Sequence, residues 1–146
     1  MSVQLLWPVA GCERVTSPYG WRYHPVHKTR SFHTGIDIAA PAGSSVWAPL
    51  TGKIAAVFDA VRSGGGLTVV IRGSIGGREV QAGVCHLSRA LVRVGDVVSA
   101  GAEIAKSGGI PGAYGSGSST APHVHLTVRI DGSRVDPQGD AISWRR

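Results

Sequence analysis

The sequence has no apolar run that approaches the roughly 18 residues needed for a membrane-spanning helix. It also lacks long helical patterns, because apolar residues at helical spacing never continue beyond about two turns. Cysteine is scarce, and Cys12 and Cys85 fit neither a metal-binding nor a redox spacing. We therefore predict no transmembrane segment and little helix, and we interpret both cysteines as small buried apolar side chains; a disulfide would need an oxidising compartment.

Acidic residues are also few. Nine Asp and Glu stand against 15 Lys and Arg, which gives a formal net charge of +6 at pH 7. Such a chain is attracted to polyanions, including nucleic acids, acidic membranes and bacterial cell-wall polymers. The basic residues are dispersed, and only Arg145 and Arg146 are adjacent. We therefore expect no nucleic-acid partner, although a simple solvated basic surface explains the charge as well as any specific polyanion site does.

Glycine is the residue in excess, with 21 copies among 146 residues against a usual share of about 7%. Gly and Pro separate short β-branched segments throughout, and no linker divides the chain, so we predict one all-β domain spanning residues 1–146. Residues 74–78 read as a hairpin turn and 88–92 as a short helical turn. The candidate strands are 36–38, 45–48, 53–58, 67–72, 78–86, 103–107 and 123–130.

A partial internal sequence similarity supports this organisation. Residues 43–48 and 95–100 share a glycine, a valine three positions later and an alanine five positions later, and an Ile-Ala pair follows each segment. We interpret them as two similar β-turn-β units in one sheet system, too short to form a repeat array.

The N-terminal residues 9–12 (Val-Ala-Gly-Cys) superficially resemble a lipoprotein cleavage site. No Lys or Arg precedes the short apolar stretch, which Pro8 interrupts, whereas a signal peptide needs a basic start and a longer apolar segment. We expect no export signal in the chain as given. It would then stay in the producing cell, leave by a separate route or form a piece of a larger protein.

A histidine pair lies in the segment 122–128. If this segment is a strand, His123 and His125 point to one face, and Val124, Leu126 and Val128 point to the other. Two neighbouring imidazoles have no obvious packing use, whereas neutral imidazole is a good zinc ligand. The alternative is a pair of surface histidines on an edge strand.

A second candidate pair is His33 and Asp37. Their even separation puts both on one side of an extended segment. Asp37 lies between Ile36 and Ile38, an apolar context in which an unpaired carboxylate is costly. A bound cation would remove that cost; the alternative is an aspartate that caps a turn.

Two histidines and one carboxylate are the ligands of many catalytic zinc sites, which keep a position for water and lower its pKa toward about 7. His86 ends the strand 78–86. It and the histidine of the pair that does not bind zinc are candidates for a general base or for a group that stabilises an oxyanion. Spacing alone does not decide which of His123 and His125 binds the metal.

Four segments, in order, carry a family resemblance. They are Ser-Pro-Tyr-Gly-Trp-Arg at 17–22, Phe-His-Thr-Gly-Ile-Asp-Ile-Ala-Ala-Pro at 32–41, His-Leu-Ser at 86–88 and Ser-Thr-Ala-Pro-His-Val-His at 119–125. Each motif is weak alone, but together they resemble the lysostaphin-type (LytM-like) zinc metallopeptidases, which cut peptidoglycan peptides. The resemblance extends from about Pro8 to Pro137, nearly the whole chain.

The resemblance implies an all-β, sandwich-like fold of antiparallel sheets with a groove across one sheet. It implies one zinc ion per chain bound by His33, Asp37 and His125, with His86 and His123 as the catalytic pair that activates water and steadies the tetrahedral intermediate. The implied protein is a monomeric, zinc-dependent endopeptidase that hydrolyses peptidoglycan cross-links of the bacterial cell wall. Small size and the missing export signal and wall-binding domain fit a phage endolysin released through a membrane lesion, or an enzyme borne by a virion.

The chain departs from the family pattern at positions that concern substrate contacts rather than zinc. Many members have an aromatic residue and an alanine where this chain has Val84 and Cys85, and an acidic residue where it has Thr127. Some members use a tyrosine near the first histidine as an oxyanion donor. The candidates for that role are Tyr19, Tyr23 and Tyr114.

Other residues near the motifs are expected to have no ligand role. We place His24 and His27 in an exposed loop beside the groove, and Cys85 should point away from the metal because it is the strand neighbour of His86. The glycine-rich residues 108–120 form either a flexible connection or a groove wall that a peptide backbone can approach closely.

Two alternative functions are weighed against the peptidase. A metal-free module of the same fold could bind peptidoglycan or activate other wall enzymes, but this chain retains all five site residues. Residues 46–53 and 94–98 faintly resemble lipoyl or biotinyl carriers. A carrier needs an exposed lysine at a hairpin tip, whereas Lys53 begins an apolar strand, and a carrier would not explain four histidines.

Overall fold

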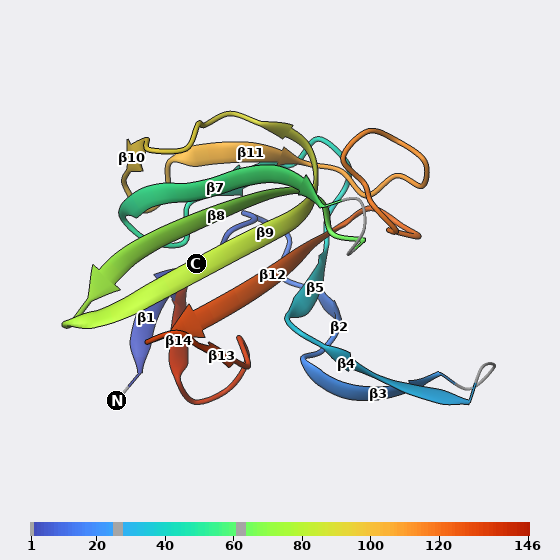
Figure 1. Cartoon of the computed structure of the whole chain (residues 1–146), viewed down its shortest axis with the longest axis horizontal. Helices are drawn as coiled ribbons and strands as arrows, with labels where there is room; N and C mark the ends of the chain where they lie inside the picture. The colour runs from blue at the N-terminus through green and yellow to red at the C-terminus, as the bar shows by residue number, and fades with distance from the viewer. Residues whose placement is uncertain (1, 25–27, 61–63) are drawn as a thin grey trace.

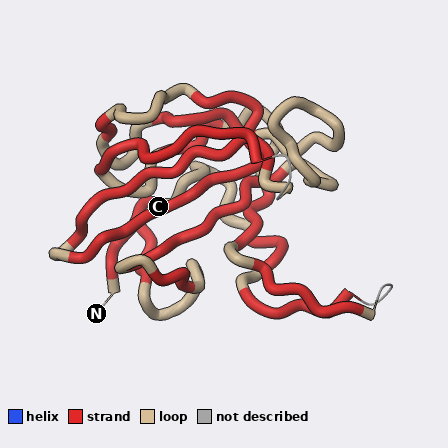
Figure 2. Tube along the Cα trace, viewed as in Figure 1, coloured by secondary structure: helices blue, strands red, loops and turns tan. Residues whose placement is uncertain are grey.

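Short strands between glycine-rich turns make the fold all-β, as predicted. The computed structural model describes residues 2–24, 28–60 and 64–146. All the regular secondary structure within these ranges is β-strand (Figures 1 and 2). The strands are β1 (Val3–Leu6), β2 (Val15–Ser17), β3 (Gly20–His24), β4 (Thr29–His33), β5 (Ile36–Ala39), β6 (Ser45–Trp47), β7 (Gly52–Ala60), β8 (Gly66–Ile75), β9 (Arg78–Ala90), β10 (Val97–Val98), β11 (Glu103–Ser107), β12 (His123–Ile130), β13 (Ser133–Val135) and β14 (Ile142–Arg145). Across these ranges, no helix is long and apolar enough to cross a membrane.

The largest sheet has the order β10-β7-β8-β9-β12-β5-β2, and all of these pairings are antiparallel. Strand β11 bridges β6 and β9, and β13 adds to β12. The parallel pair β1–β14 and the hairpin β3–β4 lie outside this sheet. Figure 1 shows β7, β8, β9 and β12 side by side, with the β3–β4 hairpin extending away from the body.

Apolar alternation fixes which side of β12 faces the core. Val124, Leu126 and Val128 are fully buried, whereas His123 and His125 are only partly buried on the opposite face. The core cluster draws on both ends of the chain through β1 and β14, and Trp7 meets Trp144 edge to face with ring centroids 5.2 Å apart. Packing of this side of the sheet therefore leaves the two imidazoles on the other side.

The predicted strands correspond to β5, β6, β7, β8, β9, β11 and β12, and the predicted hairpin turn is formed by Gly76 and Gly77, both with positive φ. The predicted helical turn at 88–92 is wrong. Strand β9 continues to Ala90 because Arg89 and Ala90 pair with β11. The cysteines were predicted to be buried, but Cys12 and Cys85 are free thiols that are only partly buried.

The two similar segments, residues 43–48 and 95–100, occupy equivalent places in the sheet. The first contains β6 and precedes β7, and the second contains β10 and precedes β11. Strand β6 pairs with β11 while β10 pairs with β7, so each unit pairs with the strand that follows the other. Lys53 lies within β7 opposite Val97 and Arg72, and not at a hairpin tip as a carrier would require.

Glycines pack the loop 108–120 tightly against the turn at 64–66. The Gly66 φ is +65°, and a Cβ there would overlap the carbonyl oxygen of Gly115. That carbonyl accepts a hydrogen bond of 2.8 Å from the Leu67 N–H, and the Ser118 N–H donates to the Gly64 carbonyl at 3.0 Å. The loop is therefore held at this point by backbone contacts that only glycine permits.

Replacement of Gly66 by Ala tests this contact. We expect Gly66→Ala to lower the free energy of unfolding by about 1–3 kcal/mol more than Gly76→Ala, because only the first places a methyl group against backbone. Gly76 is a matched control, since its φ is +58° and a Cβ there would meet nothing within 4 Å. Urea denaturation followed by tryptophan fluorescence measures both variants. Equal losses would show that positive φ alone requires glycine at residue 66.

Candidate metal centre

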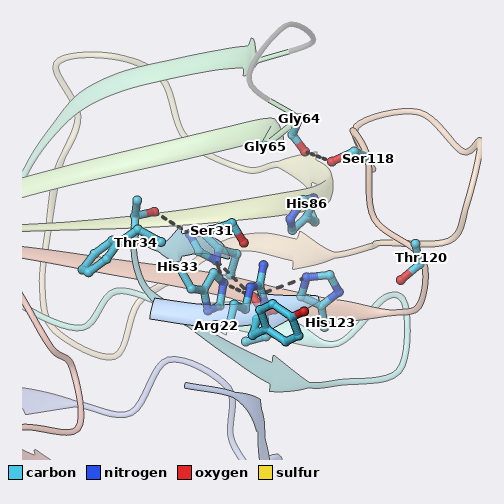
Figure 3. A pocket seen from close by; sticks show the side chains of 14 residues that line it. Arg22, Ser31, His33, Thr34, Gly64, Gly65, His86, Ser118, Thr120 and His123 are labelled. Carbon is cyan, nitrogen blue, oxygen red and sulfur yellow. Dashed lines mark hydrogen bonds and ion pairs between the residues drawn. The ribbon is translucent and has the colours of Figure 1, made fainter. Parts of the chain in front are cut away.

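Three neighbouring strands and the end of a hairpin bring the predicted site residues together. Asp37 on β5 pairs directly with His125 on β12, and His123 lies two residues before His125 on the same face. His33 ends β4, close to the start of β5. His86 comes from β9, the other neighbour of β12. All five predicted residues line one groove (Figure 3).

A β-bulge aims His86 into this groove. The register between β8 and β9 shifts between Leu67 and Val69, so that Thr68 alone faces both Cys85 and His86. His86 has a φ of +60°, a conformation that a non-glycine residue seldom adopts, and its N–H donates to the Gly65 carbonyl at 2.8 Å. Bulges commonly redirect side chains beside functional sites, and this one makes the His86 position differ from that of a regular strand.

The atoms His33 Nε2, Asp37 Oδ1 and His125 Nδ1 form a nearly equilateral triangle. The distances are 3.1 Å between the two nitrogens, 3.2 Å from His33 to Asp37 and 3.0 Å from His125 to Asp37. A tetrahedral zinc ion with bonds of about 2.0–2.1 Å would separate its ligands by about 3.4 Å. Two imidazole nitrogens and one carboxylate oxygen at these separations therefore fit a zinc ion.

The outer ring nitrogens of the two ligand histidines show why a cation suits this triangle. His33 Nδ1 donates to the Pro18 carbonyl at 2.8 Å, and His125 Nε2 lies 3.4 Å from the Thr34 hydroxyl oxygen. A carbonyl oxygen only accepts, so the proton of neutral His33 sits on Nδ1 and its Nε2 presents a lone pair. With the His125 proton on Nε2, three electron-rich atoms face one another, and a metal ion satisfies all of them.

Asp37 is held as a carboxylate. Burial by itself raises the pKa of Asp37. When His125 and His33 carry protons on the nitrogens that face Asp37, their hydrogen bonds, together with the positive charge of protonated His33 and His123, outweigh burial, and a metal ion would take the place of those protons. The pKa of the carboxyl group therefore lies well below its usual range, and the group is ionised at neutral pH. In the described ranges, these three residues are also the one group of His, Cys, Asp or Glu whose ligand atoms converge closely enough to hold an ion.

His86 and His123 form a second pair beside the triangle, with ring centroids 4.6 Å apart. His86 Nδ1 donates to the Ser116 carbonyl at 2.8 Å, and His123 Nδ1 donates to the Ala121 carbonyl at 2.7 Å. Their Nε2 atoms are thus free of protons in the neutral rings. Burial and the neighbouring charges of His123 and His125 lower the pKa of His86 despite its bond to Ser116, so His86 is neutral at pH 7 and can accept a proton.

The groove has a volume of about 720 Å³ and lies between the β3–β4 hairpin and the loop 108–120 (Figure 3). Ser118 and Thr120 line it, so the glycine-rich loop forms a groove wall, as one of our two interpretations predicted. Gly64 and Gly65 line it beside this wall.

The three candidate tyrosines occupy different positions relative to the groove. Tyr23 lines the groove, Tyr19 packs edge-on against Phe32, and Tyr114 is 70% exposed and absent from the groove lining. His24 ends β3 and does not lie in a loop as predicted, because it pairs with Thr29 across the hairpin. The prediction for His27 lies outside the described residues.

Cys85 pairs directly with His125 and so lies on the face of the sheet that carries the metal triangle, which makes the prediction that it points away from the metal wrong. Its sulfur is absent from the group of converging ligand atoms, and burial raises the pKa of its thiol. Arg22, Ser31, Phe32 and Thr34 line the groove as well, although their sequence context predicted no role for them. Alternation within the hairpin could have identified Arg22 and Ser31, because both lie on the face that carries His33.

Comparisons with known proteins agree with this geometry. The model of "Peptidase family M23" matches residues 31–137. The DD-carboxypeptidase/endopeptidase Mpg of Neisseria meningitidis is 38% identical over 130 residues, which cover 88% of this chain and 27% of that protein. The chain thus spans about a quarter of the length of this curated relative.

Solved structures show the same fold. A zinc-containing peptidase from Vibrio cholerae superposes with a TM-score of 0.79 at 29% identity, over 94% of this chain and 40% of that one. The catalytic domain of lysostaphin from Staphylococcus simulans superposes with a TM-score of 0.69 at 29% identity, over 85% of this chain and 88% of that one. The predicted lysostaphin-type resemblance is confirmed: the chain belongs to peptidase family M23.

Proposed function

We propose that this chain is a zinc-dependent endopeptidase that hydrolyses peptide cross-links of bacterial peptidoglycan. The observation that supports it most directly is the triangle of His33 Nε2, Asp37 Oδ1 and His125 Nδ1, with separations of 3.0–3.2 Å. One zinc ion per chain would be held by these three atoms. The similarity to a zinc-containing peptidase supports the choice of metal.

When bound, zinc would polarise the scissile carbonyl and lower the pKa of a water molecule in the groove. His123 and His86 would supply the proton transfers, because a backbone carbonyl holds the Nδ1–H of each and leaves Nε2 to exchange the proton; His123 Nε2 also lies 3.6 Å from Asp37 Oδ1. One imidazole would take the proton of the attacking water as the new C–O bond forms. The resulting imidazolium would hydrogen-bond to the developing negative charge, then give its proton to the leaving nitrogen as the C–N bond breaks.

The proposed substrate follows from the family and the shape of the site. Lysostaphin-type enzymes cut wall peptides, and the groove is open enough for an extended chain. The relative from Neisseria carries the name DD-carboxypeptidase/endopeptidase, so we extend the proposal to bonds between D-configured residues, either terminal or in direct cross-links. The net charge of +6 would favour approach to an anionic wall at low salt.

Other parts of the proposal concern setting and organisation. We propose that residues 1–146 form one domain, because a single apolar cluster joins β1 and β14 to the central sheet, and that it acts as a monomer. The phage endolysin or virion-borne role stays a prediction. A metal-free binding or activator module is less well supported, since all five site residues converge on one groove.

Substitution of the two β12 histidines separates metal binding from proton transfer. We expect His125→Ala to lose most of its zinc, because it removes one corner of the donor triangle. His123→Ala should keep about one zinc per chain but lose at least about 100-fold in kcat, the usual contribution of a general base. Elemental analysis after zinc repletion and a hydrolysis assay measure the two effects. Interchanged results would mean that the two roles are assigned the wrong way round.

Digestion of defined muropeptides tests the reaction itself. Zinc-loaded protein should convert cross-linked dimers to monomers, because hydrolysis of the bridging amide adds one water and separates the two stems. Chelator should abolish the conversion, and added zinc should restore it. Mass spectrometry identifies the bond that is cut. Intact glycan strands rule out a glycosidase, and cleavage that persists in chelator would contradict a metal-dependent mechanism.

A further inference from the structure

The β3–β4 hairpin presents two different faces. Its register pairs Arg22 with Ser31 and Gly20 with His33, whereas Trp21 pairs with Phe32. Because directly paired residues share a face and successive residues alternate, Arg22 and Ser31 lie on the same face as His33. Figure 3 shows all three in the groove. The other side of the hairpin carries an aromatic cluster in which Trp21 and Phe32 meet edge to face at 5.3 Å, and Tyr23 and Phe32 from this side also line the groove.

Arg22 is a cation close to the metal triangle. Its Nη1 donates to the Ser17 hydroxyl oxygen at 2.6 Å, and that oxygen lies 3.4 Å from His33 Nδ1. Arg22 is the one lysine or arginine among the described residues that line the groove. No described carboxylate lies within ion-pair distance of it, and the carboxylate of the groove, Asp37, faces the ligand histidines. The guanidinium charge of Arg22 is therefore available to an anion in the groove.

The position of Arg22 restricts which anion it can reach. Ser31 precedes His33 by two residues, so the backbone of Arg22 lies about 7 Å along the strand from that of His33, while the bond to Ser17 draws the Arg22 guanidinium closer to His33. One residue of an extended peptide covers about 3.5 Å. A carboxylate on the residue next to the scissile carbonyl would thus lie within reach of the long Arg22 side chain.

The proposed D,D-peptide substrates carry a carboxylate at that place. In a carboxypeptidase substrate, the leaving residue is the C-terminal amino acid, whose carboxylate is on the carbon bound to the scissile nitrogen. In a direct cross-link, the leaving diaminopimelate centre bears a carboxylate on the same carbon. A polyglycine bridge has no such group, because the following residue is joined there by an amide.

We propose that Arg22 is a specificity-determining residue that binds this free carboxylate on the leaving residue, with the Ser31 hydroxyl beside it. The proposal rests on the proposed peptidase function. Arg22 would hold the substrate by charge-assisted hydrogen bonds while its contact with Ser17 keeps the side chain close to His33. Peptides that end in a free D-residue, or that branch at a free carboxylate, would then be preferred over peptides that continue as an amide.

Two substrates that differ in one group provide the test: acetylated Lys-D-Ala-D-Ala with a free C-terminal carboxylate, and the same peptide as the C-terminal carboxamide. We expect the unmodified protein to prefer the acid by about 10- to 100-fold in kcat/KM, the usual effect of a charged hydrogen bond. Arg22→Gln should remove this preference, mainly by raising KM for the acid. Its kcat/KM for the amide should change less than about twofold, and its zinc content should not change.

Arg30→Gln is the matched control, because it removes the same charge from the same hairpin. Arg30 lies over the Trp21 ring at 5.0 Å and, unlike Arg22, is absent from the groove lining, so it should have no effect on the acid-to-amide ratio. Loss of activity on both substrates together with loss of zinc in Arg22→Gln would overturn the proposal and make Arg22 a positioning residue for His33. Absence of an acid preference in the unmodified protein would also overturn it.

A binding measurement separates this proposal from the peptidase function. NMR signals of residues 29–33 should shift on titration with D-Ala-D-Ala, but not with its carboxamide, and Arg22→Gln should abolish the shift. If the protein binds the acid selectively yet hydrolyses neither peptide nor any muropeptide, the proposed function fails while the role of Arg22 stands. Equal binding of acid and amide contradicts the role of Arg22, whether or not the protein is a peptidase.

Discussion

The site is organised around three ligand atoms, two imidazole nitrogens and one carboxylate oxygen, that the fold holds at 3.0–3.2 Å from one another. Backbone pairing fixes two of them, since Asp37 and His125 are direct partners across β5 and β12. The third comes from the end of the β3–β4 hairpin. Neutral imidazoles and an ionised carboxylate at these distances need a cation between them, so metal affinity is a property of the sheet register as much as of the residue types.

Backbone carbonyls around the site determine which ring nitrogen of three histidines carries the proton. Carbonyl oxygens of Pro18, Ser116 and Ala121 take the outer protons of His33, His86 and His123, and each leaves a lone pair toward the groove. These three histidines are therefore prepared as ligands or proton acceptors before any substrate arrives. This arrangement belongs to loops and strand ends, whose carbonyls are not used in the ladders of the sheet.

Alternation of apolar and polar residues along a strand made part of the fold and of the candidate site predictable from the sequence. The shared face of His123 and His125 followed from the apolar residues between them, and the turn at Gly76 and Gly77 followed from its two glycines. The position of His86 could not be predicted in the same way, because a β-bulge and a positive φ redirect it. Short edge strands such as β2 and β10 have too few residues to show a pattern, and the mistaken helical turn at 88–92 arose because pairing with β11 overrides local sequence.

The close contact of Gly66 with Gly115 links the shape of the groove to its chemistry. The same loop supplies the carbonyl of Ser116, and its end supplies that of Ala121, so a bulkier loop grafted from another protein would disturb the acceptors of His86 and His123 while it reshaped the wall. The opposite wall is less constrained, since the hairpin reaches the metal triangle only through His33. Divergence of substrate preference within this architecture is therefore easier on the hairpin side, where new side chains leave the proton-transfer histidines in place.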